Sequence, residues 1–439
     1  MTQRNTRRDF LKASAGIGAG LWVAGSEFPS LAKPLAANDK INVAIVGCGG
    51  RGGGNLNSIA GSENIVALCD VDDQRAAGAY RRFPNVPKFK DFRQMLDEVR
   101  TIDAVAVSTP DHTHAPISIA AMKLGKHVYC EKPLTHSVWE ARQMRLVADR
   151  MNLITQMGNQ GTATNGLREG VEVIQSGAIG PVREVHVWTN RPIWPQGVGR
   201  LPEQQVPNHL DWDLWLGPAP LRPYNSGYVP FKWRGWWDFG TGAIGDMACH
   251  TMNLAFMALK LEAPTRVSAE VYNFNNNETA PMGALVTYEF PARGDMPPVV
   301  MKWYERSKPP RELFQGQRPS GSGCLMIGTN GTMYSPSDYG SNHRLLPLEQ
   351  FRNYQRPEQK LPRATRGHHR EWLDGIRSNR RPFSNFVTYA SQLTETALLG
   401  NVAMRIGVPF RWDTETLTSP DCPKVARFIR REYRRGWEL

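Results

Sequence analysis

The sequence predicts an α/β protein with a doubly wound parallel sheet in its first part and a second, α+β domain behind it. Two observations predict the first part: short apolar runs alternate with helical patterns, and the first run ends in a glycine-rich turn. A third observation, the alternation of apolar and polar residues in later segments, predicts strands with one buried face. The 439 residues, 41% hydrophobic and 21% charged, are typical of a globular protein with two or three domains.

The first predicted strand, residues 41–46, is β-branched and apolar. It runs directly into Gly47-Cys48-Gly49-Gly50-Arg51-Gly52, which fits the pattern G-x-G-x-x-G. Glycines at these places allow a tight turn and let backbone amides approach a pyrophosphate at the N-terminus of the next helix. A second apolar run ends in Asp70, about 20 residues on, where a ribose-binding carboxylate belongs. We therefore predict a dinucleotide site that includes Gly47, Gly49, Gly50, Arg51, Gly52 and Asp70.

Further strands and helices alternate along the chain. We expect strands at 65–68, 104–107, 127–130 and 153–157, and helices at 55–60, 91–99, 116–124 and 138–150. Ligands of such sheets bind beyond the carboxyl ends of the strands, so the polar residues after each strand are candidate cofactor contacts. These candidates are Ser108, Pro110, His114, Glu131, Lys132, Asn159 and Gln160.

Each candidate has a structural alternative. Asp70 would accept hydrogen bonds from the ribose hydroxyls and repel a 2′-phosphate, which favours NAD, whereas the nearby Arg75 keeps NADP open. The segment 108–114 can be a helix cap with packed histidines, and Asn159 and Gln160 can form a polar hinge between domains. Lys132, near a cationic nicotinamide, would have a pKa lowered toward the range useful for proton transfer; the alternative is a surface lysine.

The second part of the chain begins with strands expected at 181–189, 265–273, 283–290 and 299–304. Seven of the 13 tryptophans fall between Trp188 and Trp237, in a segment rich in proline and glycine. Aromatic faces suit sugar rings, but such rings also pack in cores, and we assign Trp212 and Trp215 to packing. Three tryptophans lead directly into the next motif and are substrate candidates: Trp233, Trp236 and Trp237.

That motif, residues 242–250, reads Gly-Ala-Ile-Gly-Asp-Met-Ala-Cys-His. A helix that begins at Gly245 places Asp246 and His250 on one face. Oxidising an alcohol requires a base for the hydroxyl proton, and histidine suits this task near neutral pH. The carboxylate could orient the imidazole or hold a substrate hydroxyl. Alternatively, Asp246 caps the helix and His250 packs in the core. No third ligand is spaced near them, so no metal is expected.

The glycine turn 47–52, the segment 108–114 and above all Glu131-Lys132-Pro133 resemble the Gfo/Idh/MocA family, named for glucose–fructose oxidoreductase, inositol dehydrogenase and rhizopine catabolism. The resemblance runs from about residue 38 to about residue 410. It implies a Rossmann NAD(P)-binding domain over 38–157. It also implies a substrate-binding and oligomerisation domain over 158–439, with an open, mostly antiparallel sheet.

The motif D-x-x-x-H after a glycine-rich turn is the second signature of this family. The resemblance therefore implies that Lys132, Asp246 and His250 form the catalytic set. In this interpretation His250 is the base, Lys132 shares or relays the proton, and Asp246 is the orienting partner.

The N-terminal residues predict export. Thr6-Arg7-Arg8-Asp9-Phe10-Leu11-Lys12 is a twin-arginine motif, and the apolar run 13–25 behind it is too short to span a membrane permanently. We expect residues 1–37 to be a signal peptide and the protein to be periplasmic or otherwise exported. No free nicotinamide pool is expected there, so the cofactor should be tightly held and regenerated in place.

The net charge, the cysteines and the hydropathy of the chain mainly exclude classes of protein. The net charge of +12 can indicate nucleic acid, but no helix-turn-helix, zinc-finger or RNP pattern accompanies it, so we expect an ordinary basic surface. The six cysteines form no C-x-x-C pair, which favours free thiols. No other stretch is long and apolar enough for a membrane helix.

The sequence thus predicts an NAD(P)-dependent oxidoreductase that moves hydride between a tightly bound nicotinamide and a sugar or polyol carbinol, as a homo-oligomer (dimer or tetramer). One alternative is a redox-neutral glycoside hydrolase that oxidises, eliminates, hydrates and reduces its substrate in turn. The lysine of Glu131-Lys132-Pro133 argues against it, because the hydrolase relatives lack that lysine. The other alternative is a non-catalytic sugar-binding protein, against which the intact catalytic set argues.

Overall fold

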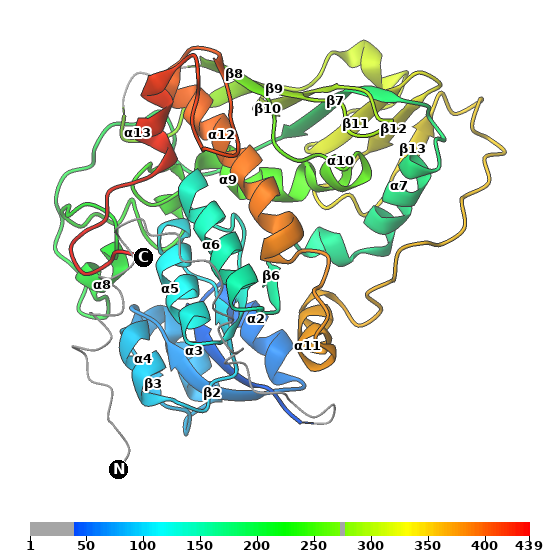
Figure 1. Cartoon of the computed structure of the whole chain (residues 1–439). Coiled ribbons are helices and arrows are strands. Elements are labelled where there is room, and N and C mark those ends of the chain that lie inside the picture. The colour runs from blue at the N-terminus through cyan, green and yellow to red at the C-terminus, as the bar shows by residue number, and fades with distance from the viewer. Residues whose placement is uncertain (1–38, 273–276) are drawn as a thin grey trace.

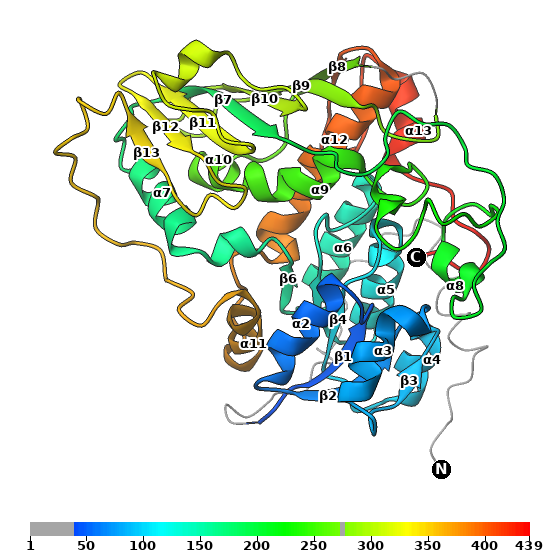
Figure 2. The same cartoon turned by 180° about the vertical axis from the view of Figure 1, so that it is seen from behind.

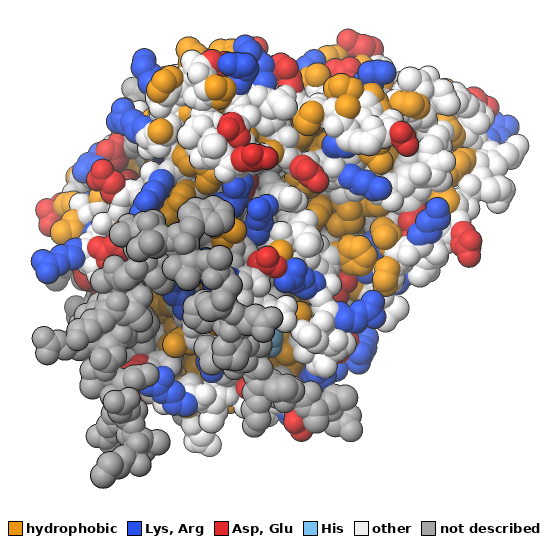
Figure 3. Space-filling view, viewed as in Figure 1, with side chains coloured by type: hydrophobic (Ala, Val, Ile, Leu, Met, Phe, Trp, Pro, Cys, Tyr) orange, Lys and Arg blue, Asp and Glu red, His pale blue; other side chains and the backbone are white. Residues whose placement is uncertain are grey.

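The structure, a computed structural model, describes residues 39–272 and 277–439 (Figure 1). The predicted export motif and signal peptide lie outside the described residues. Within the described ranges, no helix combines the length and the apolar character that crossing a membrane requires. Figure 3 shows acidic and basic side chains interspersed over the face it displays, without a block of one sign.

The first sheet is a six-stranded parallel sheet in the order β3-β2-β1-β4-β5-β6. Its strands are β1 (Asn42–Val46), β2 (Asn64–Cys69), β3 (Lys88–Phe89), β4 (Ala104–Val107), β5 (His127–Cys130) and β6 (Thr155–Met157). The central strands are buried on both faces, as their unbroken apolar runs predict. The strand order reverses at β1, so the crevice beyond β1 and β4 is where a doubly wound sheet binds its ligand.

Helices cover both faces of this sheet: α2 (Arg51–Ala60), α3 (Asp73–Arg82), α4 (Phe92–Glu98), α5 (Asp111–Lys123) and α6 (Val138–Arg150). One buried cluster joins α2 and α3 to the sheet, and another joins α4, α5 and α6 to its other face. The helix α6 begins where Ser137 and Glu140 form a reciprocal capping box. The helix α3 and the strand β3 were not predicted.

The second sheet has eight strands in the order β13-β12-β11-β7-β10-β9-β8-β14. Its strands are β7 (Val182–Thr189), β8 (Arg266–Tyr272), β9 (Gly283–Phe290), β10 (Val299–Glu305), β11 (Gly323–Gly328), β12 (Thr332–Ser335), β13 (Arg344–Leu346) and β14 (Phe410–Arg411). Only β7 and β10 pair in parallel; the other neighbours are antiparallel. The predicted fold class, a parallel Rossmann sheet followed by a mostly antiparallel one, is confirmed.

Helices on one side of the second sheet face the first domain (Figures 1 and 2). They are α7 (Asn165–Gln175), α9 (Gly242–Thr251), α10 (Asn253–Ala258) and α12 (Ser391–Ile406). The helix α12 packs against α6, α9 and β8 and so connects both domains. Arg142 of α6 and Glu395 of α12 form a two-bond ion pair at 2.9 and 3.0 Å across this contact. The helix α11 (His368–Ser378) packs back onto α2.

Residues 190–241, between β7 and α9, form what we call the aromatic insertion. It contains α8 (Trp212–Leu216) and a small core of its own, composed mainly of aromatic side chains. Arg222 lies within this core, where its guanidinium pairs with Asp238 at 2.7 Å and with Glu278 at 2.9 Å. An internal core of this kind keeps a long segment ordered without regular secondary structure.

Candidate active site

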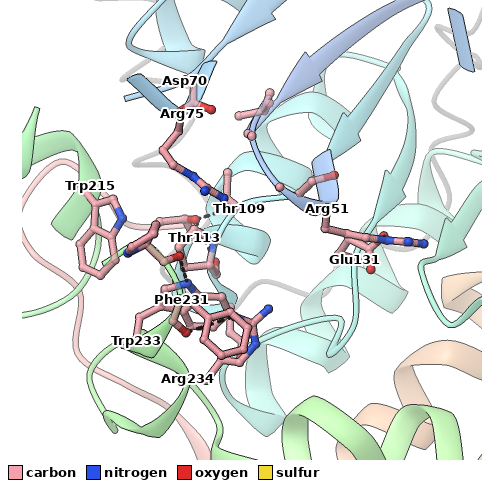
Figure 4. Close-up of a pocket in the computed structure, with 18 of the residues that line it drawn as sticks. Arg51, Asp70, Arg75, Thr109, Thr113, Glu131, Trp215, Phe231, Trp233 and Arg234 are labelled. Atoms are coloured by element: carbon pink, nitrogen blue, oxygen red, sulfur yellow. Dashed lines mark hydrogen bonds and ion pairs between the residues drawn. The ribbon is translucent and has the colours of Figure 1, made fainter. Parts of the chain in front are cut away.

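A cavity of about 560 Å³ lies between the carboxyl ends of the first sheet and the second domain. Figure 4 shows Asp70 and Arg75 at one end and Phe231, Trp233 and Arg234 at the other. The cavity brings together most of the predicted site residues: Gly47, Gly49, Gly50, Arg51, Asp70, Ser108, Pro110, Glu131, Lys132, Gln160, Trp233, Asp246 and His250.

The glycine turn forms a cradle that only glycine allows. Gly47 and Gly50 have φ values of +82° and +52°, and a Cβ on Gly52 would overlap the carbonyl oxygen of Gly47. The helix α2 follows with Gly50 as its N-cap, which supplies no side-chain hydrogen bond to the first turn. The close approach of the helix and its uncapped N–H groups fit the pyrophosphate of a dinucleotide.

Asp70 follows β2 beside this cradle. Its carboxylate accepts hydrogen bonds from the backbone N–H of Cys48 at 2.7 Å and of Asp72 at 3.0 Å. Burial raises the pKa of Asp70. Arg75 lies against the turn, with its Nη2 2.6 Å from where a Cβ of Gly50 would stand. The fixed carboxylate and the cradle together fit the ribose and pyrophosphate of NAD.

Glu131 anchors the middle of the site. Its Oε1 accepts hydrogen bonds from Arg51 Nε at 3.1 Å, Asn55 Nδ2 at 2.9 Å and Gln160 Nε2 at 3.3 Å. A Cβ on Gly158 would stand 2.6 Å from the same carboxylate. Glu131 lines the cavity, but its hydrogen bonds hold the residues around the cofactor pocket in place.

Lys132 is held by Asp246. Its Nζ donates to the backbone oxygen and to the Oδ1 of Asp246, both at 2.7 Å, and Arg234 Nε donates to the same Oδ1 at 3.0 Å. Burial alone would raise the pKa of Asp246, but the charges of Lys132 and Arg234 outweigh it and hold the pKa well below its ordinary value. We expected Asp246 to orient the imidazole of His250; its carboxylate is bound to these two cations instead.

His250 lies one helical turn after Asp246 on α9 and lines the cavity. Its Nδ1 is buried without a hydrogen-bond partner among the described residues, and Tyr339 packs edge-on against its ring at 4.6 Å. Burial, reinforced by the charge of Lys132, lowers the pKa of His250 well below its ordinary value. A neutral imidazole in this position can accept a proton.

Three predicted cofactor residues do not line the cavity. The ring nitrogens of His114 lie 2.8 Å from the carbonyl oxygens of Thr109 and Pro133, which makes it a packed histidine. Asn159 donates to the carbonyl of Cys249 at 3.3 Å and accepts from the hydroxyl of Ser384. His114 and Asn159 therefore have the structural roles that we named as alternatives. The third residue, Gly52, contributes to the site only because it has no side chain.

The tryptophans that line the cavity are not the ones that we predicted. Trp233 lines the cavity, but Trp236 lies in the core of the aromatic insertion. The ring of Trp237 packs against Arg405, whose guanidinium carbon lies 5.1 Å from the ring centroid. These two rings do not reach the cavity, because the turn before α9 directs them into the protein. Trp215, which we assigned to packing, stacks on Trp212 at 4.8 Å and also lines the cavity.

Several cavity residues were missed. They include Arg191, Phe231, Arg234, Asp338, Tyr339 and Trp437. Arg234 stands between two of the tryptophans that we did select, so its position in the sequence was a usable signal. Tyr339 and Trp437 reach the site only through the tertiary fold, and no local pattern marks them.

Fold and cavity together define a two-domain protein with the architecture of the NAD-binding oxidoreductases. Residues 41–159 match the oxidoreductase family model described as the NAD-binding Rossmann fold, and residues 171–290 match the model of its C-terminal alpha/beta domain. The two models together cover more than half of the chain, which belongs to the Gfo/Idh/MocA family.

Individual relatives match over shorter stretches. A stretch covering 43% of the chain is 29% identical to levoglucosan dehydrogenase of Pseudarthrobacter phenanthrenivorans and spans 40% of that protein. Another, covering 31% of the chain, is 34% identical to a glycosyl hydrolase family 109 protein of Solibacter usitatus and spans 35% of it. The chain thus matches less than half the length of either relative.

A solved structure supports the fold over most of the chain. The WlbA dehydrogenase of Bordetella pertussis, in complex with NADH and UDP-GlcNAcA, aligns with a TM-score of 0.60 at 17% identity. The alignment covers 85% of this chain and 99% of that one.

Proposed function

We propose that this protein transfers hydride between a tightly bound NAD and a carbinol of a sugar or polyol. The observation that carries the proposal is one cavity that holds the glycine cradle, Asp70, Lys132 and His250. The glycine cradle and Asp70 would hold the dinucleotide, and NAD when bound supplies the hydride acceptor. NADP remains the variant that Arg75 would favour.

The residues of the chain supply the proton chemistry. His250, kept neutral by burial, takes the proton from the substrate hydroxyl. Lys132 donates two of its N–H groups to Asp246 and keeps a third for the substrate oxygen, where it stabilises developing negative charge or relays the proton. Asp246 and Arg234 position the lysine. The supporting geometry is that all four side chains line the same cavity.

The substrate end of the cavity suits a carbohydrate. Phe231 and Tyr339 line it and are 43% and 41% exposed, so part of each aromatic side chain can contact a sugar ring. Arg191 and Asp338 also line the cavity and add a charged donor and a charged acceptor. The levoglucosan dehydrogenase relative supports a sugar substrate by analogy.

A second candidate is the redox-neutral glycoside hydrolase. The similarity to a glycosyl hydrolase family 109 protein favours it. The two candidates differ in product: a ketosugar or lactone for the oxidoreductase, and a free sugar without net redox change for the hydrolase.

The test begins with mature protein purified without added nucleotide. Denaturation should release NAD, and the native protein should reduce that nucleotide when offered a panel of sugars, polyols and glycosides. Reduction that persists until a second carbonyl compound is added supports the oxidoreductase. Free sugar without lasting absorbance change identifies the hydrolase, and protein without nucleotide or affinity for it contradicts both.

We also propose that the protein acts after export. The twin-arginine motif at residues 6–12 and the expectation of a tightly held cofactor support this proposal. Cell fractionation should find the protein outside the cytoplasm, and Arg7→Lys with Arg8→Lys should retain it inside.

A homo-oligomer is the last part of the proposal. Tyr272 and Val300 are exposed toward opposite ends of the second sheet, on the face that points away from α9 and α12, and apolar residues on an uncovered sheet face favour a protein contact. Light scattering should find a dimer or tetramer, which Val300→Lys should weaken.

A further inference from the structure

Buried aromatic side chains line the adenosine end of the cavity. Asp70 marks the ribose position, so the adenine of a dinucleotide would lie beyond it, away from Lys132 and His250. The wall there includes Phe92, Trp215 and Trp437, whose exposed fractions are only 7%, 7% and 8%. Neighbouring protein therefore packs over most of each of these side chains, and the contacts that do so determine how this end of the cavity is built.

The aromatic insertion supplies part of this cover. Asp211 N–H donates to the carbonyl of Val71 at 2.9 Å, and Asp73 N–H donates to the carbonyl of His209 at 3.0 Å. His209 Nδ1 also lies 2.8 Å from Asp72 Oδ1. These bonds begin one residue after Asp70, so the second domain is fastened to the first beside the predicted ribose site.

The C-terminal segment, residues 430–437, fastens the insertion in turn. Arg434 donates from Nε to the carbonyl of Gly217 at 2.8 Å and from Nη2 to the carbonyl of Asp213 at 2.9 Å, and it pairs with the Asp213 carboxylate. Figures 1 and 2 both show the chain running from α13 (Ala426–Ile429) down to a position beside α8.

Trp437 completes these contacts. Its ring packs on Phe92 with centroids 6.0 Å apart, and the Arg93 guanidinium lies 4.4 Å from its centroid. Arg93 Nη1 donates to the carbonyl of Gly436 at 3.1 Å. The indole thus joins α4 of the first domain to α8 of the insertion and faces the cavity between them.

We infer that residues 430–437 are a clasp that retains the nucleotide: Trp437 forms a wall of the adenosine subsite, and Arg434 must release α8 before the nucleotide can enter or leave. The inference rests on the proposed nucleotide binding. It makes the cofactor a resident group that exchanges slowly, as an enzyme outside the nucleotide pool requires.

The test measures nucleotide release and does not depend on turnover. Wild type, Trp437→Ala and Arg434→Ala are loaded with NADH, mixed with excess NAD, and followed by the loss of bound-NADH fluorescence. Arg435→Ala is the matched control, since it removes the same charge from an exposed neighbouring side chain. We expect release at least about tenfold faster in the first two variants, equivalent to ~1.4 kcal/mol, and unchanged in the control.

Equal release rates in wild type, Trp437→Ala and Arg434→Ala overturn the clasp while leaving the proposed function intact. A wild type that binds no NADH overturns the proposed function itself, and the clasp with it. Hydrogen exchange on the wild type gives a reading that needs no variant. NAD should slow exchange in residues 209–217 and 430–437, and absence of that protection contradicts the inference.

Discussion

One carboxylate oxygen of Asp246 forms ion pairs with two cations, and this arrangement gives the neighbouring side chains different roles. Lys132 and Arg234 lie 2.7 and 3.0 Å from Oδ1, so the carboxylate stays ionised and fixes the lysine. In the part of the chain that the structure describes, no carboxylate is hydrogen-bonded to His250, and its imidazole stays neutral because burial lowers its pKa. We therefore propose His250, and not Asp246, as the base.

We predict that His250→Gln and Lys132→Met each lower kcat by about 10²- to 10⁴-fold, the usual effect of removing a positioned proton-transfer group. Neither side chain belongs to the glycine cradle, so the nucleotide content of the purified protein should not change. Turnover and released nucleotide are measured on the same preparations. Full activity in either variant would remove that residue from the mechanism.

Asp70 should determine the choice between NAD and NADP. Asp70→Asn removes the charge that would repel a 2′-phosphate, and Arg75 is close enough to the turn to approach that phosphate. We expect NAD affinity to fall about tenfold or more and the NADP-to-NAD affinity ratio to rise. Adding Arg75→Ala should cancel the gain in NADP affinity, as measured by fluorescence titration. An unchanged ratio in Asp70→Asn would exclude this role.

Local motifs predicted the centre of the site and failed at its edges. Lys132, Asp246 and His250 follow recognisable turns, and the structure brings all three to one cavity. The prediction for His114 failed as a cavity contact because two carbonyl groups already occupy its ring nitrogens. No local sequence pattern marks Trp437 as a cavity residue, because its position depends on contacts with α4 and α8, which are distant in the sequence.

At the scale of elements, the turn into α2 shows why position 52 tolerates no side chain. The backbone of Gly52 passes so close to the carbonyl of Gly47 that a Cβ would overlap it. Both partners are main chain, which cannot swing aside as a flexible side chain can. The close approach positions the helix N-terminus for a phosphate.

Gly52→Ala should therefore displace α2 and abolish nucleotide binding, with a clear loss of thermal stability. Gly54→Ala is the matched control, because a Cβ there meets no atom within 4 Å. On the same helix, that change should preserve binding and stabilise the protein by about 0.5–1 kcal/mol. Calorimetry and NAD titration compare the two. Wild-type binding by Gly52→Ala would contradict the cradle.

The central strands of the first sheet were predicted because burial on both faces requires a continuous run of apolar residues. The strands β4 and β5 have the bounds that we expected. The strands β3 and β14 have two residues each, too few for any periodicity. The helix α3 was missed because it buries only Ala76 and Ala79 among charged residues, which gives a weak apolar stripe.

At the scale of the molecule, the cavity exists because α9, α12 and the aromatic insertion hold the two domains together. Neither domain contains the whole site: the cradle comes from the first, and Asp246 and His250 come from the second. The sequence predicted both halves of the site. Their position next to each other depends on packing between the domains, such as the contact of α12 with α6. A domain interface of this kind is a usual place for a small-molecule site.

The buried histidines make the stability of the whole molecule depend on pH. Burial lowers the pKa of eight of the ten histidines, and that of His127 falls to about 4. Below about pH 6.5 the unfolded chain binds protons that the folded protein does not, so stability falls as pH falls, by up to about 1.4 kcal/mol per pH unit for each such histidine.

His114 opposes this trend: its pKa is raised to about 10, so its contribution to stability is full below pH 6.5 and is lost as pH rises through 10. Glu305 opposes it as well, because burial raises the pKa of this carboxyl to about 8. Eight histidines against these two groups leave a net loss of stability toward acid. Scanning calorimetry should find Tm falling from pH 7 to pH 5, and His127→Gln should lessen the slope, because the variant has one fewer histidine to charge on unfolding. A Tm that stays level or rises over this interval would show that the histidines titrate freely in the folded protein.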